Sequence, residues 1–294
     1  MDFVQYIKLD NGFTVWTKRV GDGPIKILLL HGGPGYTHET FECFENFFPK
    51  EQFQLIYYDQ LGSYYSDQPD DPSLWTIERF CEEVEQVRKA LGLKSFYLYG
   101  YSWGSMLAIE YALKYQSHLK GLILSNMTAS AAAYQAYMQE IRNQFPQDVI
   151  LQLQSFEKSG TTQDPQYEKL LFEHLYKVRI CRLDPWPEQV LRSLAHFNKK
   201  VCDAIFGPDE FFVSGNCKNW NRWDSLHKIA VPTLLIGARY DTMDPKDIEK
   251  MGSLMLDAEV KICENGSHLA MYDDQETYFK ALHAFVMRQP LQVK

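Results

Sequence analysis

The chain lacks the features that mark disulfide-rich, zinc-finger and membrane-spanning proteins. Its six cysteines form no Cys-x-x-Cys pair, so reduced thiols are expected and neither a metal site nor a dithiol redox motif is indicated. No stretch approaches the ~18 consecutive apolar residues that a membrane-spanning helix needs. The first residues also lack the basic region and apolar run of a signal peptide. We therefore expect a cytoplasmic protein that does not enter a membrane.

Basic residues are also fewer than acidic residues. The sequence has 30 Lys and Arg residues against 38 Asp and Glu residues, which gives a net charge of −8. A nucleic-acid partner would require a basic surface to neutralise phosphates, so none is expected. Solubility explains the acidic balance most simply, and an acidic site for a cationic substrate is the alternative. Glycine-rich nucleotide loops of the Gly-x-Gly-x-x-Gly or Gly-Lys-Ser/Thr kind are absent, so no cofactor is implied.

What the sequence does contain is an alternation of apolar runs and amphipathic stretches. An Asn-Gly dipeptide at 11–12 predicts a hairpin over residues 4–19. Continuous apolar runs, typical of strands covered on both faces, occur at 27–30, 55–58, 96–99 and 122–124. Amphipathic stretches between them, such as 76–91, predict helices. This alternation favours an α/β fold, a mostly parallel sheet with helices on both faces.

The alternation stops at about residue 128 and resumes after 228. Between these positions the sequence predicts helices, at 131–145, 168–180 and 187–205. Two more strands and a last helix are expected after them, at 233–236, 260–262 and 275–288. We therefore expect a core domain of residues 1–127 and 229–294 and a helical insertion of residues 128–228, here called the cap. Such an insertion would cover the carboxyl edge of the sheet, where open α/β sheets bind ligands.

The pentapeptide Gly100-Tyr101-Ser102-Trp103-Gly104 follows the apolar run 96–99 directly and precedes a helical pattern. This strand–turn–helix setting defines a nucleophile elbow, in which a serine is presented on a strained turn. Glycines on either side allow the close backbone approach that the turn requires. Ser102 is therefore the expected nucleophile, and the simpler alternative is that it only caps the helix.

A serine hydroxyl is a weak nucleophile at neutral pH and needs a base and an orienting carboxylate. With a nucleophile elbow, the chain order is serine, then acid, then histidine. Asp241 follows the run 233–236 and its turn, and His268 follows the run 260–262. We expect these two residues to complete a catalytic triad with Ser102, with Asp244 as the competing acid.

Acyl transfer builds negative charge on the substrate oxygen, which two backbone N–H groups would stabilise. One is expected from Trp103, the residue after the nucleophile. The other is expected from the glycine-rich segment His31-Gly32-Gly33-Pro34-Gly35, which follows the apolar run 27–30. Gly33 is the predicted donor within this segment.

Together these motifs resemble those of the proline iminopeptidases, a family that includes the tricorn-interacting aminopeptidases and related amino-acid amidases. The resemblance covers most of the chain and rests on the segments 31–35, 59–62, 100–104 and 207–211, on Tyr240-Asp241 followed by Pro245, and on 266–268. It implies the α/β-hydrolase fold. It also implies a serine aminopeptidase that removes an N-terminal residue, proline or another small apolar one, from short peptides.

In this family, glutamates of the cap bind the α-amino group of the substrate, and Glu210 matches one of them. A carboxylate in a mostly apolar pocket would pair with the ammonium and fix how many residues precede the scissile bond. Two positions depart from the family pattern, because Thr242 stands where some members have a second glutamate and Tyr64 replaces a glycine. An amidase or esterase acting on small amino-acid amides or other small acyl substrates is therefore a second hypothesis. A non-catalytic binding protein on the same scaffold is a third.

Overall fold

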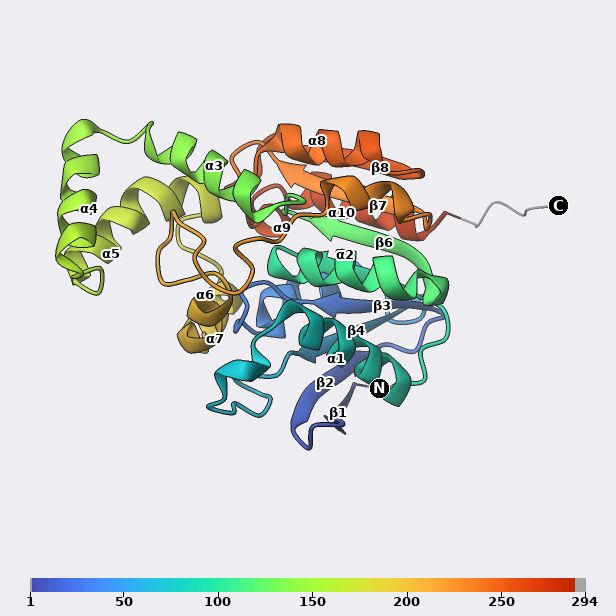
Figure 1. Ribbon diagram of the computed structural model, residues 1–294. Coiled ribbons are helices and arrows are strands. Elements are labelled where there is room, and N and C mark those ends of the chain that lie inside the picture. The colour runs from blue at the N-terminus through green and yellow to red at the C-terminus, as the bar shows by residue number, and fades with distance from the viewer. Residues whose placement is uncertain (1, 289–294) are drawn as a thin grey trace.

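An eight-stranded sheet lies at the centre of the protein, in a computed structural model that describes residues 2–288 (Figure 1). The strand order is β1-β2-β4-β3-β5-β6-β7-β8. The pairs β1–β2 and β2–β4 are antiparallel, and the other neighbours are parallel. The strands are β1 (Phe3–Lys8), β2 (Thr14–Val20), β3 (Ile25–Leu30), β4 (Phe53–Asp59), β5 (Phe96–Tyr101), β6 (Leu119–Ser125), β7 (Thr233–Ala238) and β8 (Ala258–Cys263). The mostly parallel sheet predicted from the sequence is confirmed.

Helices cover both faces of this sheet, and successive strand residues face opposite layers. Leu28 and Leu30 of β3 belong to one apolar cluster, with side chains of α1 (Ile77–Ala90), α2 (Trp103–Tyr115) and α8 (Pro245–Leu254). Ile27 and Leu29 belong to the other, with the 3₁₀ segment η1 (His38–Asn46) and the helices α9 (Ala270–Asp273) and α10 (Gln275–Val286). Because both faces are buried, the central strands appear in the sequence as unbroken apolar runs.

Between β6 and β7 the chain leaves the sheet and forms the helices of the cap, which lie to one side of it (Figure 1). These are α3 (Ala131–Arg142), α4 (Gln147–Ser159), α5 (Pro165–Leu171), the π-helical η4 (Phe172–Ile180), α6 (Glu188–Ala195) and α7 (Lys199–Ile205). Side chains of the first four, among them Met138, Leu153 and Leu175, form an apolar cluster apart from the two layers of the sheet. Short 3₁₀ segments are present at Pro72–Leu74, Gln116–His118 and Trp223–Lys228.

The structure differs from the sequence prediction in two parts of the cap. Helix α4 is not among the predicted helices. The sequence also predicts one helix over 187–205, but the structure has α6 and α7 with a break at 196–198. At the break the Asn198 main-chain N–H donates to Gly35 O over 2.9 Å, and its side-chain amide donates to Gly62 O over 2.8 Å. The helix is interrupted because Asn198 binds two loops of the core instead.

All six cysteines are free thiols. In the described part of the chain, no helix combines the length and the apolarity needed to cross a bilayer. Within residues 2–288, no group of three or more His, Cys, Asp or Glu side chains is arranged to hold a metal ion.

Candidate active site

Ser102 occupies the turn between β5 and α2. Its φ of 53° with ψ of −122° is a combination that residues with a side chain rarely adopt. The turn is held by a hydrogen bond from the Ser102 N–H to Ser125 O, over 2.9 Å. A Cβ added at Gly100 would lie 2.3 Å from Gly104 O, and one added at Gly104 would lie 2.1 Å from Leu30 O. Only glycine therefore fits at these two positions of the elbow.

Asp241 and His268 are in direct contact. The His268 Nδ1–H donates to Asp241 Oδ1 over 2.7 Å, and Asp241 has no exposed surface. The Asn126 amide donates to Asp241 Oδ2 over 2.6 Å, and the Met243 N–H donates to Oδ1 over 3.1 Å. The carboxylate is thus fixed by donors on both oxygens, so it can hold the imidazole in one orientation and tautomer.

The competing acid, Asp244, does not join this arrangement. Its carboxylate accepts from the Lys246 N–H over 2.9 Å and caps the first turn of α8. Thr242, by contrast, is 2% exposed, and its hydroxyl lies 3.3 Å from Asp241 Oδ1 and 3.5 Å from His268 Nδ1. The residue that stands in place of a second glutamate therefore contacts the acid–base pair.

The nucleophile elbow adjoins the histidine. The His268 ring lies beside the Tyr101 ring, with 5.1 Å between the ring centroids, and Tyr101 directly precedes Ser102. Among residues 2–288 no hydrogen bond joins Ser102 Oγ to His268, and such bonds are often long before substrate binds. The structure therefore brings Ser102, Asp241 and His268 to the same edge of the sheet.

Of the two predicted oxyanion donors, Trp103 directly follows the nucleophile, and Gly33 follows a glycine that lies next to it. A Cβ added at Gly32 would lie 3.3 Å from Ser102 Cβ, and Gly33 has φ of +115°, which favours glycine. Within the described residues, neither the Gly33 N–H nor the Trp103 N–H donates to another main-chain group. Trp103 is the first residue of α2, where the geometry of a helix leaves N–H groups without a partner. Both groups are therefore available to an oxygen of a ligand.

Glu210 lies in the cap, and its carboxylate accepts a hydrogen bond from the Tyr176 hydroxyl over 3.1 Å. Burial raises the pKa of Glu210, and the nearby His268 opposes part of that shift. Burial also raises the pKa of Tyr134 and Tyr176, and in both the charge of Glu210 adds to the effect. Glu210 is thus a carboxylate among aromatic side chains, close enough to His268 for the two to interact electrostatically.

The cap also supports the loop that carries the histidine. The His268 N–H donates to Arg179 O over 2.8 Å, and the Leu269 N–H donates to Ile180 O over 2.8 Å. The Ser267 hydroxyl also donates to Ile180 O, over 2.9 Å. Since Arg179 and Ile180 end the π-helical segment that contains Tyr176, one segment of the cap contacts both Glu210 and the histidine loop.

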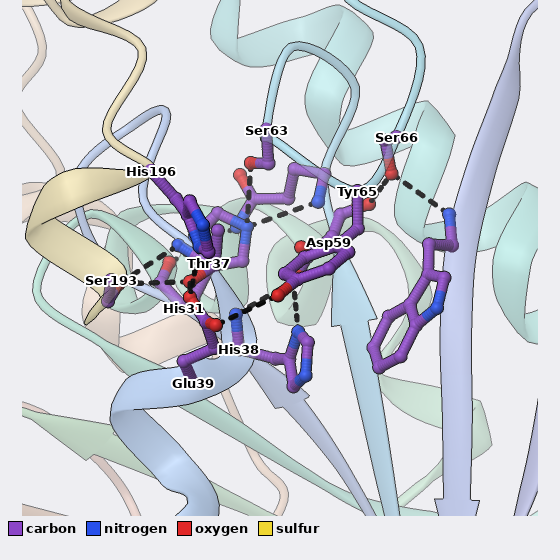
Figure 2. Close-up of polar contacts among 12 residues, drawn as sticks. His31, Thr37, His38, Glu39, Asp59, Ser63, Tyr65, Ser66, Ser193 and His196 are labelled. Carbon is purple, nitrogen blue, oxygen red and sulfur yellow. Dashed lines mark hydrogen bonds and ion pairs between the residues drawn. The ribbon is translucent and has the colours of Figure 1, made fainter. Parts of the chain in front are cut away.

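A second connection between cap and core is a polar cluster around the buried Glu39 (Figure 2). The Glu39 carboxylate accepts from the Thr37 hydroxyl over 2.6 Å, from the Tyr65 hydroxyl over 2.9 Å and from His196 Nδ1 over 2.8 Å. Arg192 of α6 pairs with the same carboxylate, over 2.9 Å. Because His196 and Arg192 belong to the cap and Glu39 to the core, this cluster joins the two.

Tyr64 takes part in the same contact. Its ring stacks on His196, with 3.8 Å between centroids and 14° between planes, and it is 51% exposed. This departure from the family pattern therefore adds to the contact between core and cap.

Asn126 is a site residue that sequence reasoning missed. It directly follows the buried strand β6, and its φ of 55° is the left-handed conformation that asparagine tolerates better than most residues. One signal in the sequence could have identified Asn126. It is a polar residue at the carboxyl end of a buried strand, and that strand lies next to the strand that precedes Ser102.

The chain is similar in sequence and in structure to known hydrolases. Residues 26–275 match the model of the alpha/beta hydrolase fold family. The chain is 49% identical to the proline iminopeptidase of Flavobacterium johnsoniae over 278 residues, which are 93% of this chain and 94% of that protein. It is 50% identical over 279 residues to the proline iminopeptidase of Elizabethkingia meningoseptica, again 93% and 94% of the two chains. The crystal structure of the proline iminopeptidase of Mycobacterium smegmatis matches with a TM-score of 0.88 and 26% identity, over 97% of both chains.

Proposed function

The chain belongs to the proline iminopeptidase family of the α/β hydrolases, and on that premise we propose that it is a serine aminopeptidase. It releases an N-terminal proline, or another small apolar residue, from short peptides. The observation that supports this most directly is the place of Glu210, a half-buried carboxylate of the cap that accepts a hydrogen bond from Tyr176 and lies close enough to His268 for the two to interact electrostatically. A cationic amino terminus bound there would leave the first peptide bond near Ser102.

In the proposed reaction, Ser102 Oγ attacks the carbonyl carbon of the first residue while His268 takes the hydroxyl proton. Asp241 orients the imidazole and stabilises its charged form. The N–H groups of Gly33 and Trp103 stabilise the oxyanion of the tetrahedral intermediate. His268 then returns the proton to the departing amine, and water hydrolyses the acyl-enzyme by the same steps.

The cap, residues 128–228, sets the substrate in this proposal. Desolvation raises the pKa of Glu210 and thereby disfavours its charged form. A cation that binds next to the carboxylate favours the charged form. The ammonium of a peptide is such a cation, whereas an acylated amino terminus is not. An enzyme that recognises the amino terminus in this way acts as an exopeptidase. We also propose that it acts in the cytoplasm, where its six free cysteines stay reduced.

A second candidate is an amidase or esterase for small amino-acid amides or other small acyl substrates. The observation in its favour is the position of Thr242, whose hydroxyl contacts Asp241 and His268. Thr242 supplies no second negative charge to the amine, so ammonium recognition rests on Glu210 and is weaker than it would be between two carboxylates.

A substrate panel separates the two candidates. It contains the p-nitroanilides of proline, alanine and leucine, together with prolinamide and p-nitrophenyl acetate. We expect the proline or alanine anilide to have the highest kcat/KM and Ser102→Ala to abolish turnover of every substrate without unfolding the protein. Slow turnover of every free-amine anilide beside rapid turnover of the ester or amide contradicts the aminopeptidase.

A further inference from the structure

Gln60 forms a bridge between two loops at the carboxyl edge of the sheet. It directly follows β4 and is 1% exposed. Its side-chain Nε2–H donates to His31 O over 3.1 Å, and its Oε1 accepts from the indole Nε1–H of Trp103 over 2.8 Å. One amide group therefore joins the segment after β3 to the start of α2.

These two segments carry the proposed oxyanion donors. His31 stands two residues before Gly33, and Trp103 supplies its own main-chain N–H. The segments also approach closely, because a Cβ at Gly104 would lie 2.1 Å from Leu30 O and 2.8 Å from His31 O. Gln60 thus lies beside a contact whose spacing sets the distance between the two N–H groups.

The chemistry of this bridge requires an amide. The His31 carbonyl needs a donor and the Trp103 indole N–H needs an acceptor, and a glutamine side chain supplies one of each. A carboxylate would place an acceptor against the His31 carbonyl. An apolar side chain would leave both buried groups without a partner, which is costly.

The His31 ring completes the bridge on the other side. The Gln60 main-chain N–H donates to His31 Nε2 over 3.1 Å, so the ring proton lies on Nδ1, which donates to Gly32 O over 2.8 Å. Figure 2 shows the Ser63 hydroxyl next to the His31 ring, and its oxygen lies 3.2 Å from Nε2. Burial lowers the pKa of His31, which favours this neutral form.

We propose that Gln60 is a positioning residue that holds the Gly33 and Trp103 N–H groups at the spacing that the oxyanion requires. This inference rests on the proposed acyl-transfer function. Gln60 does not touch the substrate, and the oxyanion exists only after Ser102 has attacked. Loss of the bridge therefore lowers kcat and leaves KM nearly unchanged, because it weakens an interaction made in the transition state alone.

The first test compares Gln60→Met with Gln54→Met. Gln54 lies on β4, the strand that Gln60 follows, and its amide donates to Gly21 O over 3.2 Å. The control therefore removes an amide hydrogen bond away from the elbow. We expect Gln60→Met to lower kcat on the proline anilide about ten- to hundredfold, less than the 10²–10³ lost when an oxyanion donor is removed. Its KM should stay within about threefold of wild type, and the control should retain wild-type kcat.

The second test separates positioning from a general loss of structure. The boronic acid analogue of proline adds to Ser102 as a tetrahedral adduct, and one boron-bound oxygen occupies the oxyanion position. L-Proline, the product, needs no oxyanion contact. We expect Gln60→Met to weaken boronate binding by about the same factor as kcat/KM and to leave the inhibition constant of proline within about twofold. A merely structural role would weaken both ligands together.

A third variant keeps the test decisive if Gln60→Met fails to fold. Gln60→Glu retains the acceptor for the Trp103 indole, but its ionised form replaces the donor to His31 O with a second acceptor. It should be impaired in kcat at neutral pH and recover towards wild type as the pH falls, since a protonated carboxyl can donate again. The same boronate and proline measurements apply to it.

The inference is overturned if the folded Gln60 variants keep wild-type kcat and boronate affinity, or if boronate and proline affinities fall by equal factors. Failure of the proposed function gives a different result. In that case the wild-type protein itself turns over no free-amine substrate and does not bind the proline boronate.

Discussion

The side-chain amide of Asn126 donates to Asp241 Oδ2, the carboxylate oxygen that His268 does not use. Asn126 directly follows β6, which lies between the strand before Ser102 and the strand before Asp241. The two contacts hold the Asp241 carboxylate from both sides, so the orientation of the imidazole depends on a residue outside the proposed triad.

Replacement of Asn126 by glycine should therefore lower activity without disturbing the turn. Glycine adopts the left-handed φ that Asn126 has here, so Asn126→Gly removes the amide and keeps the backbone. A hydrogen bond to a charged group contributes about 1.5–3 kcal/mol. We expect kcat/KM to fall by roughly ten- to hundredfold, measured beside thermal unfolding. Asn126→Ala should lose the same activity and also some stability, because alanine strains at this φ. Wild-type kcat/KM in the glycine variant would contradict the role.

The acid of the triad can be tested against its neighbour in sequence. Asp241→Asn keeps the shape of the side chain but favours the wrong tautomer of His268, and we expect kcat to fall by about 10⁴. Asp244→Asn is the matched control, because asparagine also caps a helix well and α8 should keep its first turn. Its kcat should stay within about threefold of wild type. The reverse ranking of the two variants would assign the acid to Asp244.

Glu210→Gln should affect only substrates with a free amine. Loss of the charged partner should raise KM for the proline anilide by roughly tenfold or more, since charge-assisted hydrogen bonds contribute about 1.5–3 kcal/mol. Turnover of p-nitrophenyl acetate, which has no amine, should change less than twofold. An equal loss on both substrates would show that Glu210 supports the fold of the pocket and not the recognition of the amine.

The pH dependence gives a separate test of Glu210. Burial raises its pKa, so in the free enzyme Glu210 takes up a proton at a higher pH than an ordinary glutamate does. Since the ammonium pairs with the charged form, kcat/KM for free-amine substrates should fall with decreasing pH through that raised pKa. In Glu210→Gln this part of the acid limb should disappear. An unchanged acid limb in the variant would count against the assignment.

The Glu39 cluster predicts a stability difference between two neighbouring glutamates. Glu39 is buried and accepts hydrogen bonds from both core and cap, whereas Glu42 pairs with Arg192 at a partly exposed position. We expect Glu39→Gln to lose about 1.5–3 kcal/mol of unfolding free energy and Glu42→Gln to lose about 0–1 kcal/mol. Thermal melting of both variants at neutral pH checks this ranking. Equal melting temperatures would contradict it.

The Glu39 cluster also predicts how the contribution of Glu39 to stability changes with pH. Burial alone would raise the pKa of Glu39, but hydrogen bonds from Thr37, His196 and Tyr65 outweigh it and lower the pKa. A carboxyl whose pKa is lower in the folded state contributes stability above its unfolded pKa and loses it as the pH falls through the folded value. The difference in stability between wild type and Glu39→Gln should therefore shrink as the pH decreases into that range. A difference that grows on acidification would rule out this account.

The sequence predicted the parts of this structure that depend on local pattern. Apolar runs located the strands because both faces of the sheet are buried, and the elbow glycines located Ser102 because no side chain fits beside Gly104 O or Leu30 O. The interactions of Asn126 and Gln60 could not be predicted in this way. They depend on which strands are neighbours, and the order β4-β3-β5-β6-β7 is not contained in any single segment.

Helix α4 was missed by the sequence prediction for a different reason. It begins after Pro146 and ends at Gly160 in a left-handed conformation, so start and stop signals are present. Only Val149 and Leu153 of this helix are fully buried. Phe156 packs against the same cluster, so the apolar face has the helical spacing 149, 153 and 156. The adjacent Ile150 and the exposed Leu151 obscure this spacing in the sequence, so the pattern does not distinguish a helix from another apolar segment.

The main-chain carbonyls of Arg179 and Ile180 give the cap a structural role in the core, because they support the loop that contains His268. Because the main chain at His268 and Leu269 donates to them, removing residues 128–228 would leave His268, the proposed general base, without this support and two N–H groups without acceptors. Deletion of the cap at its boundaries should therefore not leave an active core domain. An exchange of the cap to change substrate preference should therefore also alter proton transfer by His268. The segment around residues 179–180 and the loop that contains His268 should be transferred together.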